Sequence, residues 1–481
     1  MGTTQTTANV LLVVLDSVRA RNMSLYGHEN ATTPFLEEFA ARATVYRQAR
    51  SPGTWSLPSH VSLFTGHPVA SHGITSIGHR LRPGHTFYDT LRSDGYSTGV
   101  FSENPFLTQA DTGLADAFDH VEGPRNLLFD EGLDPTEFTL REGYGEYLAY
   151  LKACIDHDHV IKSLANGLHT KVAWDLPWLL PWTIEASTPG RVYTDLFLEW
   201  VEDQDRWAAC INYMDTHHPY EPETRFDKWG GARARSLQRD TDDQVWDFLG
   251  ERRPWWQLRA LESLYDGTIL QVDEEIRRVI DGLETLGELE ETLVVITSDH
   301  GEGFGEVGHH PPLRAVGHGP GLQEPLVHVP LLVKVPGQQY GSFIESPASL
   351  SRVADAVSAV RTGESVEDAF TRDPVVTSNY GLNESGVRKA TQYGAPTDLL
   401  TGESHAVYDE ADPGIDKFVT WQGSGATLRV VDSRTAYALA HDDGGRVEAV
   451  LSDLPNARVR TDRSADIDDE TKQRLEHLGY R

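Results

Sequence analysis

The chain has 481 residues, of which 39% are hydrophobic and 24% charged, as in an ordinary globular protein. Its formal net charge of −31 would repel nucleic acid and anionic membrane surfaces, so we expect neither as a partner. Only eight of the 42 basic residues are Lys, and this composition is typical of proteins from salt-loving microbes. It predicts a halophilic protein that loses structure at low salt, in preference to an ordinary acidic enzyme.

Cysteine content and the N-terminus suggest an intracellular protein. Cys154 and Cys210 are too few for a disulfide framework, and their apolar neighbours predict that both are core residues. The first nine residues have no basic region, and no apolar run reaches the roughly 18 residues of a membrane span. We therefore expect a cytoplasmic location without a signal peptide.

The first third of the chain alternates strand and helix patterns. The apolar run 9–15 reads as a buried strand that ends at Asp16. Further strands are expected over 44–46 and 97–101, and helices from Pro34 to Phe39 and over 89–95. Such alternation predicts a mostly parallel α/β core with helices on its faces.

A turn-rich stretch, 52–58, leads into a helix that should end at Gly66. Ser56 is expected just before the N-terminus of this helix, where unpaired N–H groups and the helix dipole favour negative charge. Its hydroxyl could be held near a metal and attack an anionic ester. The alternative is that Ser56 or Ser59 is an ordinary N-cap.

From about 121 to 192 the pattern loosens. Nine of the eleven Trp residues fall between Trp174 and Trp256, where they would pack the core of an insertion or line a pocket. We expect the insertion, about 121–260, to shape the pocket. Within it, a helix over 198–207 and a strand over 208–214 would deliver Asp215 and His217 to the edge of the sheet.

A long amphipathic helix over 261–286 precedes an apolar strand, 293–297, that leads to Asp299 and His300. Ligands of open α/β sheets bind beyond the carboxyl ends of the strands, where Asp16 also emerges. Two carboxylates, one imidazole and the Ser56 oxygen are a plausible set of ligands for a divalent metal. Strand-end caps and turns are the alternatives for these residues, although a turn needs no His.

The composition changes after a strand over 327–335 and a helix over 349–360. A boundary near 362–365 would divide a catalytic α/β domain, 1–363, from a small C-terminal α+β subdomain, 364–481. Short strands between 416 and 451 predict an antiparallel sheet there, and the charged residues 461–475 predict a peripheral helix.

Taken in order, several of these motifs resemble the sulfatase branch of the alkaline phosphatase superfamily, in a haloarchaeal-like version. The resemblance covers most of the chain and lies in Leu15-Asp16-Ser17-Val18-Arg19, Ser56-Leu57-Pro58-Ser59-His60, Asp215-Thr216-His217-His218-Pro219-Tyr220 and Ser298-Asp299-His300-Gly301-Glu302. It implies an alkaline-phosphatase-like fold and a sulfuric ester hydrolase.

The resemblance also assigns roles. It implies that Ser56 is the nucleophile or the precursor of formylglycine, and that His217 and His318 are the general acid and anion contacts. His309 and His310 compete with His318 for this role. Arg19 would bind an anionic oxygen of the substrate or brace the turn at Ser56.

Three departures from the family pattern bear on the chemistry. His60 stands where sulfatases have the Arg of Cys/Ser-x-Pro-x-Arg, which puts formylglycine at Ser56 in question and makes His60 the candidate substrate contact at that position. Ser17 replaces the usual second Asp, which leaves Asp16, Ser56, Asp299 and His300 as the metal ligands. No Lys stands at the usual sulfate-contacting positions.

Three functional hypotheses follow. The first is a metal-dependent sulfatase-like hydrolase of small-molecule or glycan sulfate or phosphate esters. The second is an enzyme like the phosphodiesterases or phosphoglycerol transferases that uses unmodified Ser56, and the third is an inactive protein that binds an anionic glycan. One divalent cation, Ca, Mg or Mn, would suit the ligands, and Zn is possible.

Overall fold

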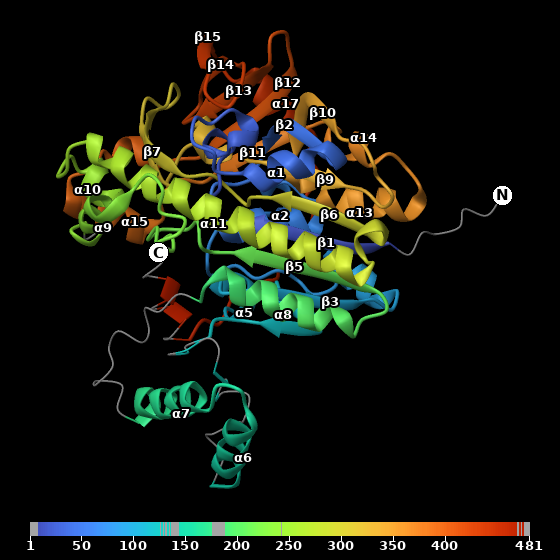
Figure 1. The fold of residues 1–481 in the computed structure, drawn as a ribbon. Coiled ribbons are helices and arrows are strands. Elements are labelled where there is room, and N and C mark those ends of the chain that lie inside the picture. The colour runs from blue at the N-terminus through green and yellow to red at the C-terminus, as the bar shows by residue number, and fades with distance from the viewer. Residues whose placement is uncertain are drawn as a thin grey trace.

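The computed structural model describes residues 8–125, 127, 129, 132–133, 135, 144–175, 188–241, 243–468, 471–472 and 474–475. Its main sheet has eight strands in the order β10-β2-β9-β6-β1-β5-β3-β4 (Figure 1). These are β1 (Asn9–Leu15), β2 (Thr44–Arg50), β3 (Ser97–Ser102), β4 (His120–Glu122), β5 (Trp207–Tyr213), β6 (Thr292–Thr297), β9 (Leu331–Lys334) and β10 (Ser342–Ser349).

All strands of this sheet run in the same direction except β9, which is antiparallel to β2 and β6. In the centre, Val14 of β1 pairs with Asn212 of β5 on one side and with Thr297 of β6 on the other. The residues that follow these three strands therefore emerge at one carboxyl edge. The predicted mostly parallel α/β core is confirmed.

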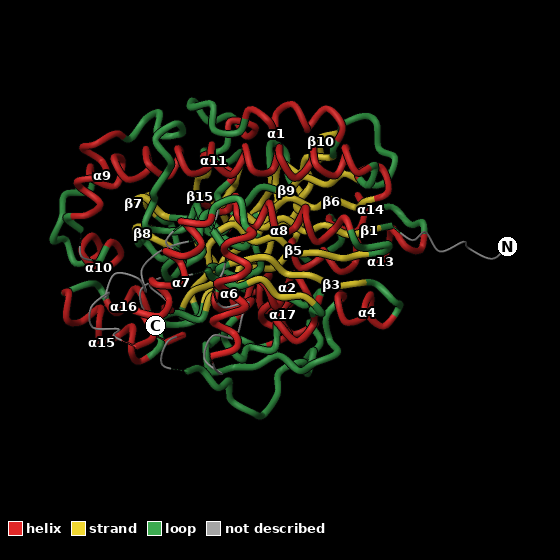
Figure 2. The backbone as a smooth tube through the Cα atoms, turned by 60° about the horizontal axis from the view of Figure 1, so that its bottom comes forward, coloured by secondary structure: helices red, strands yellow, loops and turns green. Residues whose placement is uncertain are grey.

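The sheet separates two hydrophobic cores because the side chains of each strand alternate between its faces. Leu11 and Val13 pack on the face covered by α1 (Pro34–Phe39), α8 (Gly190–Glu202) and α11 (Trp256–Leu286). Leu12 and Val14 pack on the face covered by α2 (Ser56–Thr65), α4 (Phe87–Ser93) and α13 (Val353–Thr362). Figure 1 shows α8 and α11 crossing in front of the strands, and Figure 2 shows the strands as the middle layer.

A second, antiparallel sheet of five strands follows in the C-terminal part: β11 (Val375–Asn379), β12 (Ser404–Glu410), β13 (Ile415–Trp421), β14 (Ser424–Val430) and β15 (Ala436–Asp442). It was predicted for 416–451 but begins earlier. The first two strands are separated by the helices α15 (Glu384–Tyr393) and α16 (Thr397–Leu400), and α17 (Gly445–Asp453) follows the last strand. A two-stranded ribbon, β7 (Gly303–Val307) and β8 (Arg314–Gly317), precedes this part.

The remaining α-helices of the described residues are α3 (Val69–His72), α5 (Pro105–Thr108), α6 (Tyr144–Asp156), α7 (Val160–Asp175), α9 (Gly231–Arg239), α10 (Gln244–Leu249), α12 (Glu324–Val327) and α14 (Val366–Phe370). The helix expected over 198–207 is displaced. It starts at Gly190, buries Tyr193, Phe197 and Val201 at helical spacing, and ends at Glu202 before Trp207 opens β5.

The peripheral helix expected over 461–475 is wrong for residues 461–468, which are not helical. The backbone of this segment bonds to residues 78–80 instead: the Thr461 N–H donates to the Arg80 carbonyl and the Ala465 N–H to the Gly78 carbonyl, both at 3.0 Å. Extended pairing with a distant segment thus overrides the local helical pattern. Residues 471–472 and 474–475 are helical as predicted, and 469–470 and 473 lie outside the described residues.

Candidate active site

The helix α2 begins slightly earlier than the sequence predicted, and Ser56 is not its N-cap. Trp55 occupies the cap position, Ser56 is the first helical residue, and Gly66 ends the helix in the left-handed region at φ 77°. The Ser56 hydroxyl donates a hydrogen bond to Oδ2 of Asp16 at 3.2 Å and lies 3.5 Å from Nε2 of His300. Ser56 is fully buried. Its hydroxyl faces the Asp16 carboxylate rather than the helix backbone, as the hydrogen bond to Asp16 shows.

Asp16 follows β1 directly and is held by four donors. Ser17 Oγ donates to its Oδ1 at 2.8 Å, and Ser56 Oγ and Asn104 Nδ2 donate to its Oδ2, each at 3.2 Å. Thr216 Oγ1 donates to the Asp16 carbonyl at 2.6 Å. Asp16 is fully buried, and these contacts fix its carboxylate at the end of the strand.

Asp299 and His300 follow β6 at the same edge. Oδ1 of Asp299 accepts the N–H groups of Ser17 at 3.2 Å and His300 at 3.0 Å. Burial alone would raise the pKa of Asp299, but the neighbouring His300 and His60 lower it, so this carboxyl is ionised. Gly301 is required next to it, because a Cβ there would meet the Pro325 carbonyl oxygen at 2.0 Å.

The geometry of these residues fits a divalent metal. Ligand atoms of Asp16, Asp299 and His300 all lie within 4.8 Å of one another, and all three side chains are buried. Oδ2 of Asp299 lies 3.5 Å from Nε2 of His300. Nδ1 of His300 donates to the Gly301 carbonyl at 2.9 Å, which leaves the lone pair of Nε2 directed at the carboxylates. Two buried carboxylates facing an imidazole lone pair call for a cation.

His217 and His318 lie next to this cluster. The ring centroid of His318 is 4.9 Å from that of His300 and 5.1 Å from that of His217. Burial and the neighbouring His318 lower the pKa of His217. Oε2 of Glu302 lies 3.6 Å from Nδ1 of His318. Burial alone would raise the pKa of Glu302, but the nearby His318 more than offsets this and lowers it, so an ionised carboxylate faces this histidine.

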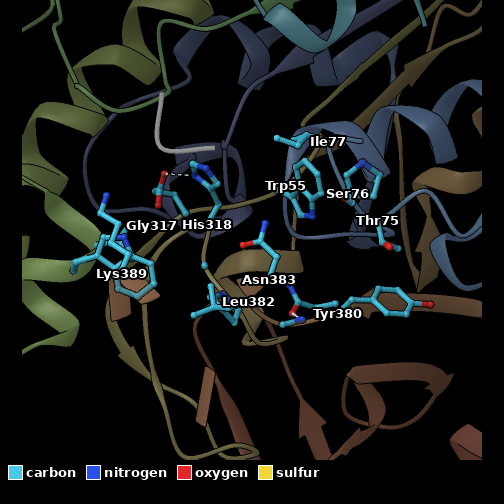
Figure 3. A pocket seen from close by; sticks show the side chains of 18 of the residues that line it. Trp55, Thr75, Ser76, Ile77, Gly317, His318, Tyr380, Leu382, Asn383 and Lys389 are labelled. Carbon is cyan, nitrogen blue, oxygen red and sulfur yellow. Dashed lines mark hydrogen bonds and ion pairs between the residues drawn. The ribbon is translucent and has the colours of Figure 1, made fainter. Parts of the chain in front are cut away.

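A cavity of about 420 Å³ opens above the two histidines. Figure 3 shows His318 at its wall, with Trp55 across the cavity and Tyr380, Asn383 and Lys389 contributed by the C-terminal part. Trp246 and His218, which belong to the segment 121–260, also line it. Trp207 is a core residue, and Trp178 and Trp182 lie outside the described residues.

Arg19 does not occupy the position that the sequence suggested. Its guanidinium is fully buried away from Ser56 and donates to Glu262, Glu306, Asn22 and the Glu302 carbonyl at 2.5–2.9 Å. Burial lowers its pKa, but the two carboxylates outweigh this and raise it. These bonds engage four of the five N–H donors of Arg19. Arg19 thus connects α11 to β7, in place of the predicted substrate contact or brace of the Ser56 turn.

His60 lies one helical turn after Ser56 and is also fully buried. Its Nδ1 donates to the Ser56 carbonyl at 2.9 Å and lies 3.7 Å from Oδ2 of Asp299. The structure therefore places His60 beside Asp299 with its Nδ1 bonded to the Ser56 backbone, a position that supports the cluster in place of the predicted substrate contact.

Asn104 could not be predicted as part of the site, because no spacing sets it apart from ordinary polar residues. Glu302 and Ser17 stood in the quoted motifs without an assigned role at the site. The structure gives Ser17 a positive φ of 60°, which is strained for Ser and common at functional sites.

The comparison with protein families decides the assignment. The sulfatase family model matches residues 8–361. The chain belongs to the sulfatase family. An N-acetylglucosamine-6-O-sulfatase of Bacteroides thetaiotaomicron is 39% identical over 338 residues, which cover 62% of this chain and 59% of that protein. A multifunctional alkaline phosphatase superfamily protein of Trinickia caryophylli is 32% identical over 373 residues, 69% of each.

A steryl-sulfatase of Rattus norvegicus is 23% identical over 396 residues, which cover 74% of this chain. The chain spans between 59% and 69% of the length of these three relatives. Among solved structures, the phosphonate monoester hydrolase of Agrobacterium radiobacter superposes with a TM-score of 0.58 at 16% identity, covering 98% of this chain and 94% of that chain. This likeness confirms the alkaline-phosphatase-like fold.

Proposed function

We propose that this chain is a metal-dependent hydrolase of sulfate or phosphate esters in which Ser56 supplies the nucleophile. The observation that carries the proposal is the convergence of Ser56 with Asp16, Asp299 and His300 at one buried edge. The relatives are named as a sulfatase and as a multifunctional superfamily protein, which supports ester hydrolysis as the reaction class.

Asp16, Asp299 and His300 would hold one divalent cation, with the Ser56 oxygen as a fourth ligand. When bound, such a cation lowers the pKa of the seryl hydroxyl and neutralises charge on the ester oxygens. Asp16 orients the hydroxyl through the 3.2 Å hydrogen bond, at the positive end of α2. His318, which lines the cavity and lies next to Glu302, would protonate the leaving oxygen.

One observation favours unmodified Ser56 over formylglycine. The residue at the family's Arg position, His60, bonds to the Ser56 carbonyl and faces Asp299, so its ring supports the metal ligands. An unmodified Ser56 would make phosphate-ester cleavage by a seryl hydroxyl the second candidate function. Mass spectrometry of the peptide that contains Ser56 separates the two: a formyl group indicates sulfatase chemistry, and an intact Ser indicates a hydroxyl nucleophile.

The test of the proposal is Asp299→Ala, which should abolish both divalent-cation binding, measured by calorimetry, and turnover of aryl sulfate and aryl phosphate. Asp215→Asn is the matched control. Asp215 also follows a central strand and is half-buried, but it accepts hydrogen bonds from Gln271 at 2.7 Å and Gly190 at 3.2 Å, away from the cluster. Retained cation affinity in Asp299→Ala would refute the ligand set, and absence of turnover in the metal-loaded wild type would leave only a binding role.

A further inference from the structure

A second cavity lies at the edge of the main sheet opposite the candidate active site. It measures about 480 Å³ and lies between the strands β2 and β9 and the helices α13 and α14 (Figure 1). Thr44, the first residue of β2, lines it, as do Val335 and Gln338, which follow β9. The active-site residues emerge at the carboxyl ends of the parallel strands. This cavity, at the amino end of β2, is therefore a separate site.

The walls of this cavity are largely apolar. Valine side chains from three elements line it: Val333 from β9, Val360 from α13 and Val366 from α14. Tyr46 lines the side formed by β2, and its ring packs against that of Phe370 with the ring centroids 5.2 Å apart. Walls of this kind bind the hydrocarbon part of a small molecule.

The hydroxyl of Tyr46 is a polar group of this wall that lacks a partner. Tyr46 is fully buried, and its Oη forms no hydrogen bond with any of the described residues. Burial raises the pKa of Tyr46, and the carboxylates of Glu367 and Asp368 raise it further, so the hydroxyl stays protonated and can both donate and accept. An unpaired buried hydroxyl costs free energy, which a ligand with a polar group at this position would recover.

The charged side chains of the cavity are acidic. Glu364 and Glu367 line it and are exposed, and none of the described lining residues is Lys, Arg or His. Thr44 Oγ1 and Ser342 Oγ donate to Oε1 of Glu367 at 3.2 and 3.1 Å, which holds this carboxylate in place. Both bonds use Oε1, so Oε2 can accept from a ligand. Negative charge beside an apolar wall favours a cation with a hydrocarbon body.

We propose that this cavity binds a small organic ammonium ion, in which a primary amine is attached to an apolar body. The ammonium would donate to Tyr46 Oη and to Oε2 of Glu367, and the apolar body would lie against the valines. A primary amine with a pKa of about 10 is charged at neutral pH. This inference is independent of the proposed ester hydrolysis, because it uses no residue of the active site.

Other small occupants match fewer of these groups. A carboxylate or phosphate ion would be repelled by Glu364 and Glu367. A neutral alcohol would pair with Tyr46 Oη but would leave both carboxylates without a counter-charge. A water molecule would also pair with the hydroxyl, but it would leave the valine walls in contact with water.

Isothermal titration calorimetry of the full chain with phenethylammonium, phenethyl alcohol and phenylacetate tests the proposal. The three probes share a phenyl ring and differ in charge. We expect the ammonium to bind roughly tenfold more tightly than the alcohol, because a hydrogen bond with a charged partner is worth about one tenfold step or more. Phenylacetate should not bind. Asp299→Ala should bind the ammonium like the wild type, which separates this cavity from the carboxylates of the active site.

The variant Tyr46→Phe removes only the unpaired hydroxyl. It should weaken binding of the ammonium roughly tenfold, and it should not lower the melting temperature, because this hydroxyl bonds to none of the described residues. Glu367→Gln should bring the affinities for the ammonium and the alcohol close together. The matched control is Tyr96→Phe, which removes a hydroxyl that donates to the Ala8 carbonyl at 3.1 Å outside the cavity. It should bind the ammonium like the wild type.

A wild type that does not bind phenethylammonium would overturn the proposal. So would equal affinity for phenethyl alcohol, or an unchanged affinity for the ammonium in Tyr46→Phe. Loss of ammonium binding in Asp299→Ala together with normal binding in Tyr46→Phe would place the amine at the active site instead.

Discussion

The carboxylate of Glu324 joins the main sheet to the C-terminal sheet, and its removal gives a sharp prediction. Oε2 of Glu324, at the start of α12, lies 2.8 Å from a guanidinium nitrogen of Arg50 at the end of β2. Oε1 lies 2.8 Å from Nζ of Lys417 on β13 and accepts a hydrogen bond from Tyr408 Oη at 3.3 Å. The side chains of Arg50 and Lys417 are 0% and 2% exposed. Glu324→Gln would leave two buried cations without their shared counter-charge.

The pKa of Glu324 gives the size of the effect. Burial alone would raise it, but Arg50 and Lys417 more than offset this and lower it from 4.5 to about 2. A drop of that size corresponds to roughly 3 kcal/mol in favour of the ionised form. For its partner Lys417, burial lowers the pKa even though Glu324 raises it. Keeping the Lys417 ammonium charged in this site therefore costs free energy. We therefore expect Glu324→Gln to lower the free energy of unfolding by about 3 kcal/mol, the lower end of the range for breaking a buried ion pair.

Urea unfolding in molar KCl at neutral pH measures this loss. Asp409→Asn on the neighbouring β12 is the matched control, because its pair with Arg446 is exposed, at 33% and 47%, and such pairs contribute about 1 kcal/mol or less. Since the folded-state pKa of Glu324 is lowered, its stabilisation is present above about pH 4.5 and is lost as the pH falls towards 2. If Glu324→Gln costs no more than Asp409→Asn, the cluster does not stabilise the fold and the reasoning fails.

Two further predictions concern the whole chain and Arg19. The excess of acidic residues should make the melting temperature fall steeply from molar KCl to dilute buffer, in a thermal scan followed by circular dichroism; an unchanged value would remove the halophilic interpretation. Arg19→Met should lower the free energy of unfolding by roughly 3 kcal/mol, because Glu262 and Glu306 lose their buried partner. The KM for a small aryl ester should stay unchanged, and a raised KM with unchanged stability would return Arg19 to a substrate role.

The parts of the site that the sequence predicted share one physical cause. Asp16 and Asp299 each follow an apolar run, and a run that is buried on both faces must be a central parallel strand. The carboxyl ends of such strands meet at one edge, so residues 283 positions apart in the numbering could be placed together. Ser56 was found because the turn before it and Gly66 after it mark a helix.

The residues that the sequence misplaced depend on partners far away in the chain. Arg19 stands three residues after Asp16, which made an anion-binding role plausible, but its carboxylate partners Glu262 and Glu306 come from α11 and β7. His60 matched a substrate-contacting position only by its place in a motif. In the fold that position turns inward, beneath Asp299. Local patterns define which element a residue belongs to, but not which side chains meet it.

The C-terminal sheet is also part of the active site, although a composition change separates it in the sequence. Its strand β11 bonds to the loop that leads into α2: Thr377 Oγ1 donates to the Ser51 carbonyl at 2.7 Å, and the Ser378 N–H donates to the Pro52 carbonyl at 2.9 Å. Asn379 Nδ2 donates to Thr54 Oγ1 at 2.5 Å. The same strand and α15 line the cavity. A segment that both holds the loop before Ser56 and faces the substrate space couples nucleophile position to pocket shape, so changes of specificity in this fold should arise together with changes in turnover.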